Sequence, residues 1–141
     1  MTQCQTQKND IIMTELENEF MRFWIKDGIL YSEFKYDVIV DLHKVKQLIE
    51  TRYAISSNVK QYWCYDVSKG KGFPKESRDY VEIYGQDFLF ASALVINSHI
   101  QKFLFNTFLK LKKSQIPFQA FTNKQKAVEW LNDLKTKNEQ G

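Results

Sequence analysis

Residues 20–36 read FMRFWIKDGILYSEFKY, and this stretch decides how the fold begins. Two strand-like runs, Phe20 to Lys26 and Ile29 to Tyr36, flank the dipeptide Asp27-Gly28. An Asp-Gly pair supplies the positive φ values that a two-residue type I′ turn requires. The sequence therefore predicts a β-hairpin whose turn is formed by these two residues.

After the hairpin, helical periodicity alternates with short β-branched or aromatic runs. Asp41 is the expected N-cap of the first helix, and Thr122 with Gln125 forms a capping box before the last. The expected elements are helices over residues 42–54, 75–84, 99–113 and from Thr122 to about Lys137, and strands over 59–67, 93–96 and 118–121. Strands that alternate with helices favour parallel pairing through right-handed crossovers. We therefore predict a single α/β domain in the order β-β-α-β-α-β-α-β-α, with a mixed, mostly parallel sheet of about five strands and four helices.

The length of 141 residues fits one domain. Residues 1–18 are rich in Gln, Asn and Glu, so we expect a polar leader outside the core. The domain itself is expected over residues 19–137, followed by a short tail at 138–141.

Charge is unevenly distributed although the net charge is only +3. Residues 1–34 carry a net charge of −3 and residues 98–141 a net charge of +5, which indicates one basic face. The chain has no arginine cluster and no nucleic-acid recognition motif, so a solvated lysine surface is favoured over nucleic-acid binding. No apolar run approaches the roughly 20 residues of a membrane span, and no signal peptide is recognisable, so we expect a cytoplasmic protein.

Residues with catalytic or metal-binding chemistry are few. Cys4 and Cys64 form neither a disulfide framework nor a zinc spacing, and His43 and His99 have no ligand-forming neighbours. Gly70-Lys71-Gly72 follows a strand and precedes a helix, but it lacks the remaining residues of a phosphate-binding loop. The sequence therefore predicts no metal, no cofactor and no catalytic residues, and hence a protein that is not an enzyme.

In an open parallel sheet, ligands bind beyond the carboxyl ends of the strands. If this chain binds a ligand or partner there, the residues that form this edge are Asp66, Ser68, Gly70, Gly72, Asn97, Ser98, Thr122 and Asn123. The alternative is that these residues only form turns and helix caps.

The predicted helix 99–113 is apolar over more than one stripe. Phe105 and Leu109 form a possible second stripe, which would serve as an interface to a partner protein or to a second copy in a homodimer. The alternative is a helix that is buried in the core. Aromatic residues make up 15% of the chain and are expected mainly in the core. The more specific alternative is that some of them line a pocket or an interface.

Four segments carry a resemblance to a known family: Trp24 to Tyr31, Tyr65 to Ser68, Ala93 to Asn97 and Phe121 to Leu131. Together with the order of elements, they resemble STAS-like proteins, which have the SpoIIAA-like fold, and more narrowly a small uncharacterised bacterial branch. The resemblance implies a regulatory module that binds a protein partner, or alternatively a domain that binds a small molecule or lipid.

The switch proteins of this family carry a phosphorylatable serine at the start of the second helix. The resemblance implies Ser77 as the acceptor, with Ser68 second. The corresponding segment here, Pro74-Lys-Glu-Ser-Arg-Asp79, lacks the flanking Asp, second Ser and Gly of the family's motif.

Overall fold

The computed structural model describes residues 14–99, 102 and 115–140. Its elements are strands β1 (Glu15–Glu17), β2 (Met21–Lys26), β3 (Ile29–Phe34), β4 (Val38–Ile39), β5 (Gln61–Asp66), β6 (Gly70–Gly72), β7 (Leu89–Val95) and β8 (Phe118–Phe121), and helices α2 (Leu42–Ser56), α3 (Lys75–Tyr84) and α5 (Lys124–Gln140).

The hairpin prediction is confirmed. β2 and β3 pair antiparallel, and Lys26 lies opposite Ile29 across the turn. Asp27 and Gly28 have φ values of 52° and 79°, as a type I′ turn requires. A Cβ atom on Gly28 would lie 2.7 Å from Lys135 Cε, but the end of this flexible side chain can move aside, so conformation rather than packing favours glycine here.

The main sheet has six strands in the order β1-β2-β3-β5-β7-β8. The pairs β1-β2 and β2-β3 are antiparallel, whereas β3-β5, β5-β7 and β7-β8 are parallel. The prediction of a mixed sheet is confirmed, but the prediction of a mostly parallel sheet of about five strands was wrong. The difference arises at Glu15–Glu17, which was assigned to the leader but forms the antiparallel edge strand, with Leu16 packed on the core.

The described residues contain three helices, not the predicted four. The predicted helix 99–113 lies mostly outside the described residues, and so do Phe105 and Leu109. The N-cap of α2 is Asp41, as predicted, with its carboxylate accepting from Lys44 N at 2.9 Å. The capping box at Thr122 was wrong by one residue, because Asn123 Oδ1 accepts from Lys126 N at 3.0 Å. Helix α5 then continues to Gln140, into the predicted tail.

A second, two-stranded sheet joins β4 and β6 in parallel. The segment around Gly70-Lys71-Gly72 was not assigned to a strand, but it is held by hydrogen bonds such as Val40 N to Gly72 O at 2.9 Å. This segment is therefore a hydrogen-bonded strand of the fold, next to the start of α2.

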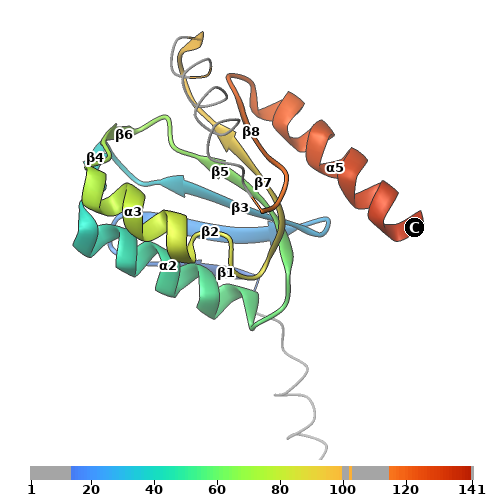
Figure 1. Cartoon of the computed structure of the whole chain (residues 1–141), viewed down its shortest axis with the longest axis horizontal. Coiled ribbons are helices and arrows are strands. Elements are labelled where there is room, and N and C mark those ends of the chain that lie inside the picture. The colour runs from blue at the N-terminus through green and yellow to red at the C-terminus, as the bar shows by residue number, and fades with distance from the viewer. Residues whose placement is uncertain (1–13, 100–101, 103–114, 141) are drawn as a thin grey trace, which may run out of the picture.

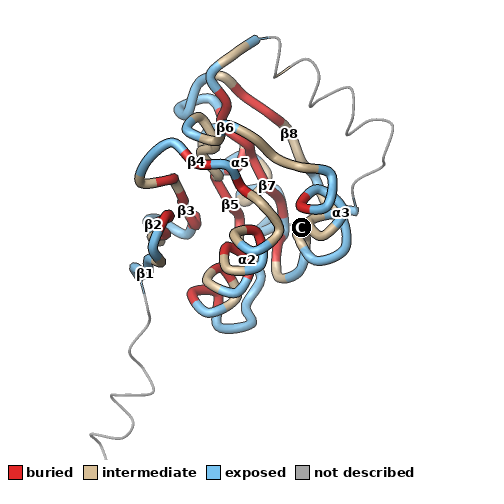
Figure 2. The backbone as a smooth tube through the Cα atoms, turned by 90° about the vertical axis from the view of Figure 1, so that its left-hand side faces the viewer, coloured by how far each residue is buried: buried red, intermediate tan, exposed pale blue. Residues whose placement is uncertain are grey.

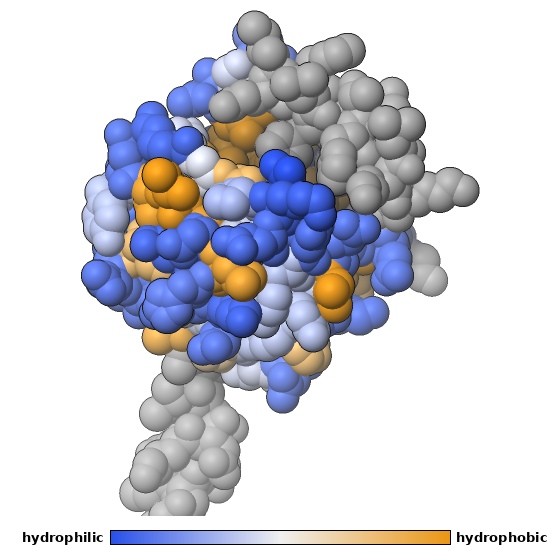
Figure 3. All heavy atoms as spheres, turned by 60° about the vertical axis from the view of Figure 1, so that its left-hand side comes forward, coloured by the Kyte–Doolittle hydropathy of each residue, from blue (hydrophilic) through white to orange (hydrophobic). Residues whose placement is uncertain are grey.

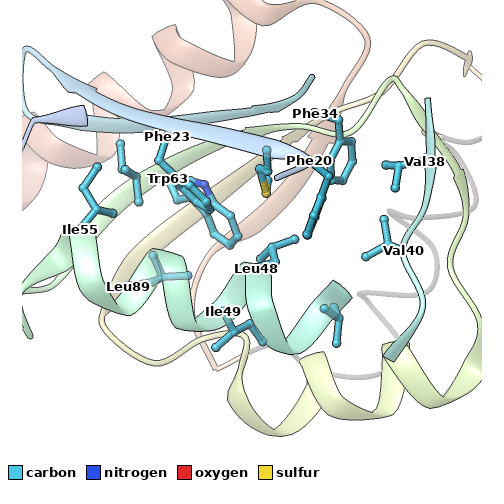
Figure 4. Packing of buried hydrophobic residues seen from close by; sticks show 13 residues of the cluster. Phe20, Phe23, Phe34, Val38, Val40, Leu48, Ile49, Ile55, Trp63 and Leu89 are labelled. Atoms are coloured by element: carbon cyan, nitrogen blue, oxygen red, sulfur yellow. The ribbon is translucent and has the colours of Figure 1, made fainter. Parts of the chain in front are cut away.

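The helices lie on opposite faces of the main sheet (Figure 1). Helices α2 and α3 lie side by side on one face, and α5 covers β5, β7 and β8 on the other. Residues of β2, β3 and β5 pack against α2 in the larger core cluster, which Figure 4 shows from close by. Figure 2 shows that burial is concentrated in the central strands, while α3 and α5 are mostly half-buried or exposed.

Candidate functional site

The sheet and the α2–α3 pair border a partly open apolar cavity of about 360 Å³. Helix α3 packs mainly against α2 rather than against the strands, and it contributes Val81 to the cavity lining. The described residues that line the cavity come from both layers and from the β4–β6 region: Phe34, Val40, Val45, Leu48, Ile49, Trp63, Tyr65, Val67, Gly70, Lys71, Gly72, Phe73, Val81, Gly85, Gln86, Leu89, Ser92, Leu94, Ile116 and Phe118.

Aromatic rings on the sheet form much of the cavity floor. Trp63 and Tyr65 alternate along β5 and stack with ring centroids 4.4 Å apart and planes only 8° apart. Phe34 on β3 meets Tyr65 edge-on, with centroids 6.1 Å apart. The indole of Trp63 is fixed further by a buried hydrogen bond from Nε1 to Ser32 Oγ at 3.0 Å. Such stacked and hydrogen-bonded rings make a rigid apolar surface.

The lining includes only a few polar side chains. Lys71 belongs to the exposed part of β6, and its ammonium lies 3.8 Å from Asp37. Gln86 accepts a hydrogen bond from Gln115 N at 3.1 Å. Ser92 is 1% exposed, and its hydroxyl is buried without a hydrogen-bond partner among the described residues. An otherwise apolar cavity with one or two polar groups is typical of small-molecule sites.

A buried arginine holds one end of the cavity in place. Arg52 on α2 is completely buried, and its guanidinium donates to Asp87 O at 2.8 Å and to Gly85 O at 3.3 Å. It also lies over the Trp63 ring, 4.9 Å from the centroid. Burial lowers the pKa of Arg52 to about 10, so it is still charged at neutral pH. Arg52 thus ties α2 to the turn before β7, which includes the lining residues Gly85 and Gln86.

Two ionisable groups of β5, Cys64 and Tyr65, are held in their neutral forms. Burial raises the pKa of Tyr65, which lines the cavity, well above its ordinary value. Burial also raises the pKa of the Cys64 thiol to about 11, and Cys64 packs on the opposite face, against α5. At neutral pH the described cavity wall therefore contains no thiolate or phenolate nucleophile.

Comparison with known proteins places this chain in a family. The profile of a domain of unknown function, DUF7793, matches residues 23–135, which is most of the chain. The chain belongs to the DUF7793 family. No curated protein matches it.

The fold is also found among solved structures. The DUF7793 domain is similar to the crystal structure of an uncharacterised protein of the DUF3478 family from Shewanella loihica PV-4, described as having a SpoIIAA-like fold. The TM-score is 0.57 at 14% identity, covering 82% of this chain and 98% of that one. The SpoIIAA-like fold that the sequence resemblance implied is therefore confirmed, while this likeness shows the fold alone.

Only some residues of the predicted binding edge line the cavity. Gly70 and Gly72 line it, but the other predicted edge residues do not. Asp66, Ser68 and Asn97 do come together: Asp66 Oδ1 accepts from the backbone N and the hydroxyl of Ser68, and Asn97 Nδ2 donates to Ser68 O at 3.2 Å. Asn123 caps α5. In this part of the edge, the alternative of turn and cap residues describes the geometry better.

The two predicted phosphorylation sites differ in access. Ser77 lies at the start of α3, as expected, but it is completely buried and its hydroxyl donates to Val40 O at 2.8 Å. A kinase cannot reach this hydroxyl while α3 is in place, so the ranking of Ser77 before Ser68 is not supported. Ser68 is half-buried, and a phosphate there would stand against the carboxylate of Asp66.

The histidines and cysteine are not brought together. His43 and His99 are both exposed near helix starts, and Cys64 is buried on the α5 face. Among the described residues there is no group of three side chains that could hold a metal ion. None of the described helices is long and apolar enough to cross a membrane.

The sequence analysis did not identify the residues that matter most for the cavity. Trp63, Tyr65 and Val67 alternate along the predicted strand 59–67, which was a signal for one apolar face. Ser92 interrupts the apolar run from Leu89 to Ile96, and a polar residue within a buried strand was the available clue.

Proposed function

We propose that this domain binds a small apolar molecule in the cavity between the sheet and helices α2 and α3, and that it does so without catalysing a reaction. The observation that carries the proposal is the cavity itself, with about 360 Å³ of space and walls of Trp63, Tyr65, Phe34 and aliphatic side chains. Ligand sites in proteins commonly have about 300–1,000 Å³ of space and mostly apolar walls. This proposal takes the ligand-binding alternative of the sequence analysis and moves its site from the strand edge to the sheet face.

A non-catalytic role is supported by the chemistry of the wall. Its ionisable side chains among the described residues are Lys71, which is paired with Asp37, and Tyr65, whose raised pKa keeps it neutral. Acid–base or nucleophilic catalysis needs groups whose pKa values lie near the working pH.

Binding of naphthalene, a rigid apolar probe, tests the proposal. We expect saturable binding at one site, an increase in melting temperature by mass action, and NMR shift changes at the amides of β5 and β7. Val81→Phe narrows the cavity from α3 and should weaken binding at least about tenfold, since overfilling a packed site is unfavourable.

The matched control is Val59→Phe, because Val59 is 63% exposed and does not line the cavity. This variant should bind naphthalene like the wild type. If the wild type does not bind naphthalene, or if intramolecular NOEs show the cavity filled by side chains of the chain itself, the proposal is wrong.

The second candidate function is a regulatory module that binds a protein partner. It is supported by two adjacent apolar side chains at the C-terminal end of α3, where Ile83 is 68% and Tyr84 42% exposed. In the view of Figure 3, however, hydrophobic residues form separate patches among hydrophilic ones rather than one large surface. Stable protein interfaces usually have a continuous apolar centre.

Site-specific photo-crosslinking in the native host separates the two functions. A crosslinker at position 83 should give one discrete protein adduct if α3 binds a partner, and a crosslinker at the exposed Lys75 on the first turn is the control. The homodimer predicted through Phe105 and Leu109 stays a prediction, because both residues lie outside the described part of the chain. Sedimentation of the wild type and Phe105→Asp tests it.

A further inference from the structure

Two buried serines on the same face of the sheet differ in one respect. Ser32 on β3 is 2% exposed and Ser92 on β7 is 1% exposed. The hydroxyl of Ser32 accepts from Trp63 Nε1 at 3.0 Å, whereas the hydroxyl of Ser92 has no partner among the described residues. Buried hydroxyls in proteins are normally hydrogen-bonded, so an unpaired one requires an explanation.

The position of Ser92 suggests that explanation. In the sheet register, Ser92 lies beside Trp63 on β5 and Phe118 on β8, and all three line the cavity. Its neighbours in the floor are therefore aromatic rings, which cannot replace a hydrogen-bond partner. Ser92 belongs to the wall of the cavity, but its hydroxyl has almost no accessible surface, so a bound molecule would reach it after a small shift of the neighbouring side chains.

We propose that the cavity takes a neutral, mainly apolar molecule with one hydrogen-bonding group, and that this group pairs with Ser92 Oγ. The inference rests on the ligand-binding function proposed above and names the class of ligand. It also assigns Ser92 as the residue that selects within that class and orients the molecule on the sheet.

The ligand group at Ser92 is neutral, because the buried Arg52 guanidinium behind Trp63 already donates to Asp87 O and Gly85 O and is not part of the described lining. The one cationic side chain in the described lining is Lys71, which belongs to the exposed β6 segment and is paired with Asp37. A charged group at the floor would lose its hydration without gaining an opposite charge, which is strongly unfavourable. A hydroxyl or carbonyl group gains a hydrogen bond there at little cost.

The experiment compares three probes of one skeleton: naphthalene, 2-naphthol and 2-naphthoate, measured at pH 7 by calorimetry. The wild type should prefer 2-naphthol over naphthalene roughly three- to tenfold, which is the usual net effect of one hydrogen bond. It should bind 2-naphthoate more weakly than naphthalene. Ser92→Ala should bring the ratio for 2-naphthol over naphthalene to about one and leave naphthalene binding unchanged or stronger.

Ser56→Ala is the matched control, because it removes a buried hydroxyl that already donates to Tyr53 O at 2.9 Å and that does not line the cavity. It should retain the preference for 2-naphthol. If Ser92→Ala does not fold, NOEs in the wild type between 2-naphthol and the Ser92 Hβ protons provide the same test.

The outcomes separate this inference from the proposed function. The role of Ser92 is overturned if naphthalene binds and 2-naphthol is not preferred, or if the preference for 2-naphthol survives Ser92→Ala. It is also overturned if NOEs at Ser92 are missing or if 2-naphthoate binds more tightly than naphthalene. Each of these results leaves the cavity as an apolar site. Failure of all three probes to bind overturns both.

Discussion

At the scale of single residues, Ser32 and Ser92 should respond differently to the same substitution in the ligand-free protein. Ser32→Ala leaves Trp63 Nε1 buried without an acceptor, so the free energy of unfolding should fall by about 1–3 kcal/mol. Ser92→Ala removes an unpaired hydroxyl, so the free energy of unfolding should stay the same or rise. Urea unfolding of the two variants and the wild type measures both effects. Equal losses would mean that Ser92 has a partner within the folded chain.

Cys64 should make the protein less stable at alkaline pH. Its folded-state pKa is raised by burial from about 9 to about 11, so the folded form holds the proton more tightly than the unfolded form. The resulting stability is complete below pH 9 and is lost as the pH rises through 11. Relative to pH 8, the wild type at pH 10.5 should lose about 2 kcal/mol more than Cys64→Ala.

Chemical unfolding at pH 8 and pH 10.5 measures this difference. The pKa values of Tyr53 and Tyr65 are also raised, and these tyrosines lose stability in the same direction in both proteins, so their effect cancels in the comparison. The pKa of Tyr31 is raised mainly by burial and in smaller part by Cys64, so only the smaller part differs between the two proteins. Parallel pH profiles for the wild type and Cys64→Ala would show that the thiol is more solvated than its position in the sheet indicates.

At the scale of elements, the start of α5 offers a sharp test between neighbouring residues. Asn123→Ala should lower the free energy of unfolding by about 1 kcal/mol, because Asn123 Oδ1 satisfies Lys126 N at 3.0 Å. Thr122→Ala should have a smaller effect, although the sequence pattern had assigned the cap to Thr122. A larger loss for Thr122→Ala in thermal or urea unfolding would restore the capping box.

Local chemistry explains which elements could be predicted. The hairpin, α3 and β8 were predicted well, because a turn dipeptide, a terminating Gly85 and a bounded aromatic run are signals within a few residues. Strands β1 and β6 were missed, because Glu15–Glu17 and Gly70–Gly72 have little strand propensity of their own. They become strands only when β2 and β4 are alongside, and that information is not local.

The cavity was harder to predict than the fold for a related reason. Alternation along β5 shows which side chains share a face, but not whether a helix will fill the space above them. That depends on α3 packing mainly against α2, which is a tertiary contact with no local pattern in the sequence. The aromatic content had been interpreted mainly as core, and Trp63 indeed serves both the core and the cavity wall.

At the scale of the whole molecule, Arg52 connects the core, the α3–β7 turn and the cavity. No carboxylate among the described residues is in hydrogen-bond contact with its buried charge, and burial lowers its pKa from 12.5 to about 10. In the folded state the charged form is thus disfavoured by about 3 kcal/mol, since one pKa unit corresponds to 1.36 kcal/mol. Replacing a buried ion pair or triad as a whole by apolar side chains is often neutral for stability, because the cost of burying the charges is removed with them.

Arg52→Met should therefore separate stability from binding. The relief of the buried charge and the loss of the bonds to Gly85 O and Asp87 O act in opposite directions, so we expect the free energy of unfolding to change by less than about 1.5 kcal/mol. Binding of 2-naphthol should weaken severalfold, because Gly85 and Gln86 form the cavity wall and lose their anchor to α2. Arg22→Met, which removes an exposed arginine 3.6 Å from Glu33, is the control and should change neither quantity measurably. A loss of more than 3 kcal/mol in stability with unchanged probe affinity in the folded fraction would show that Arg52 supports the core alone and does not shape the cavity.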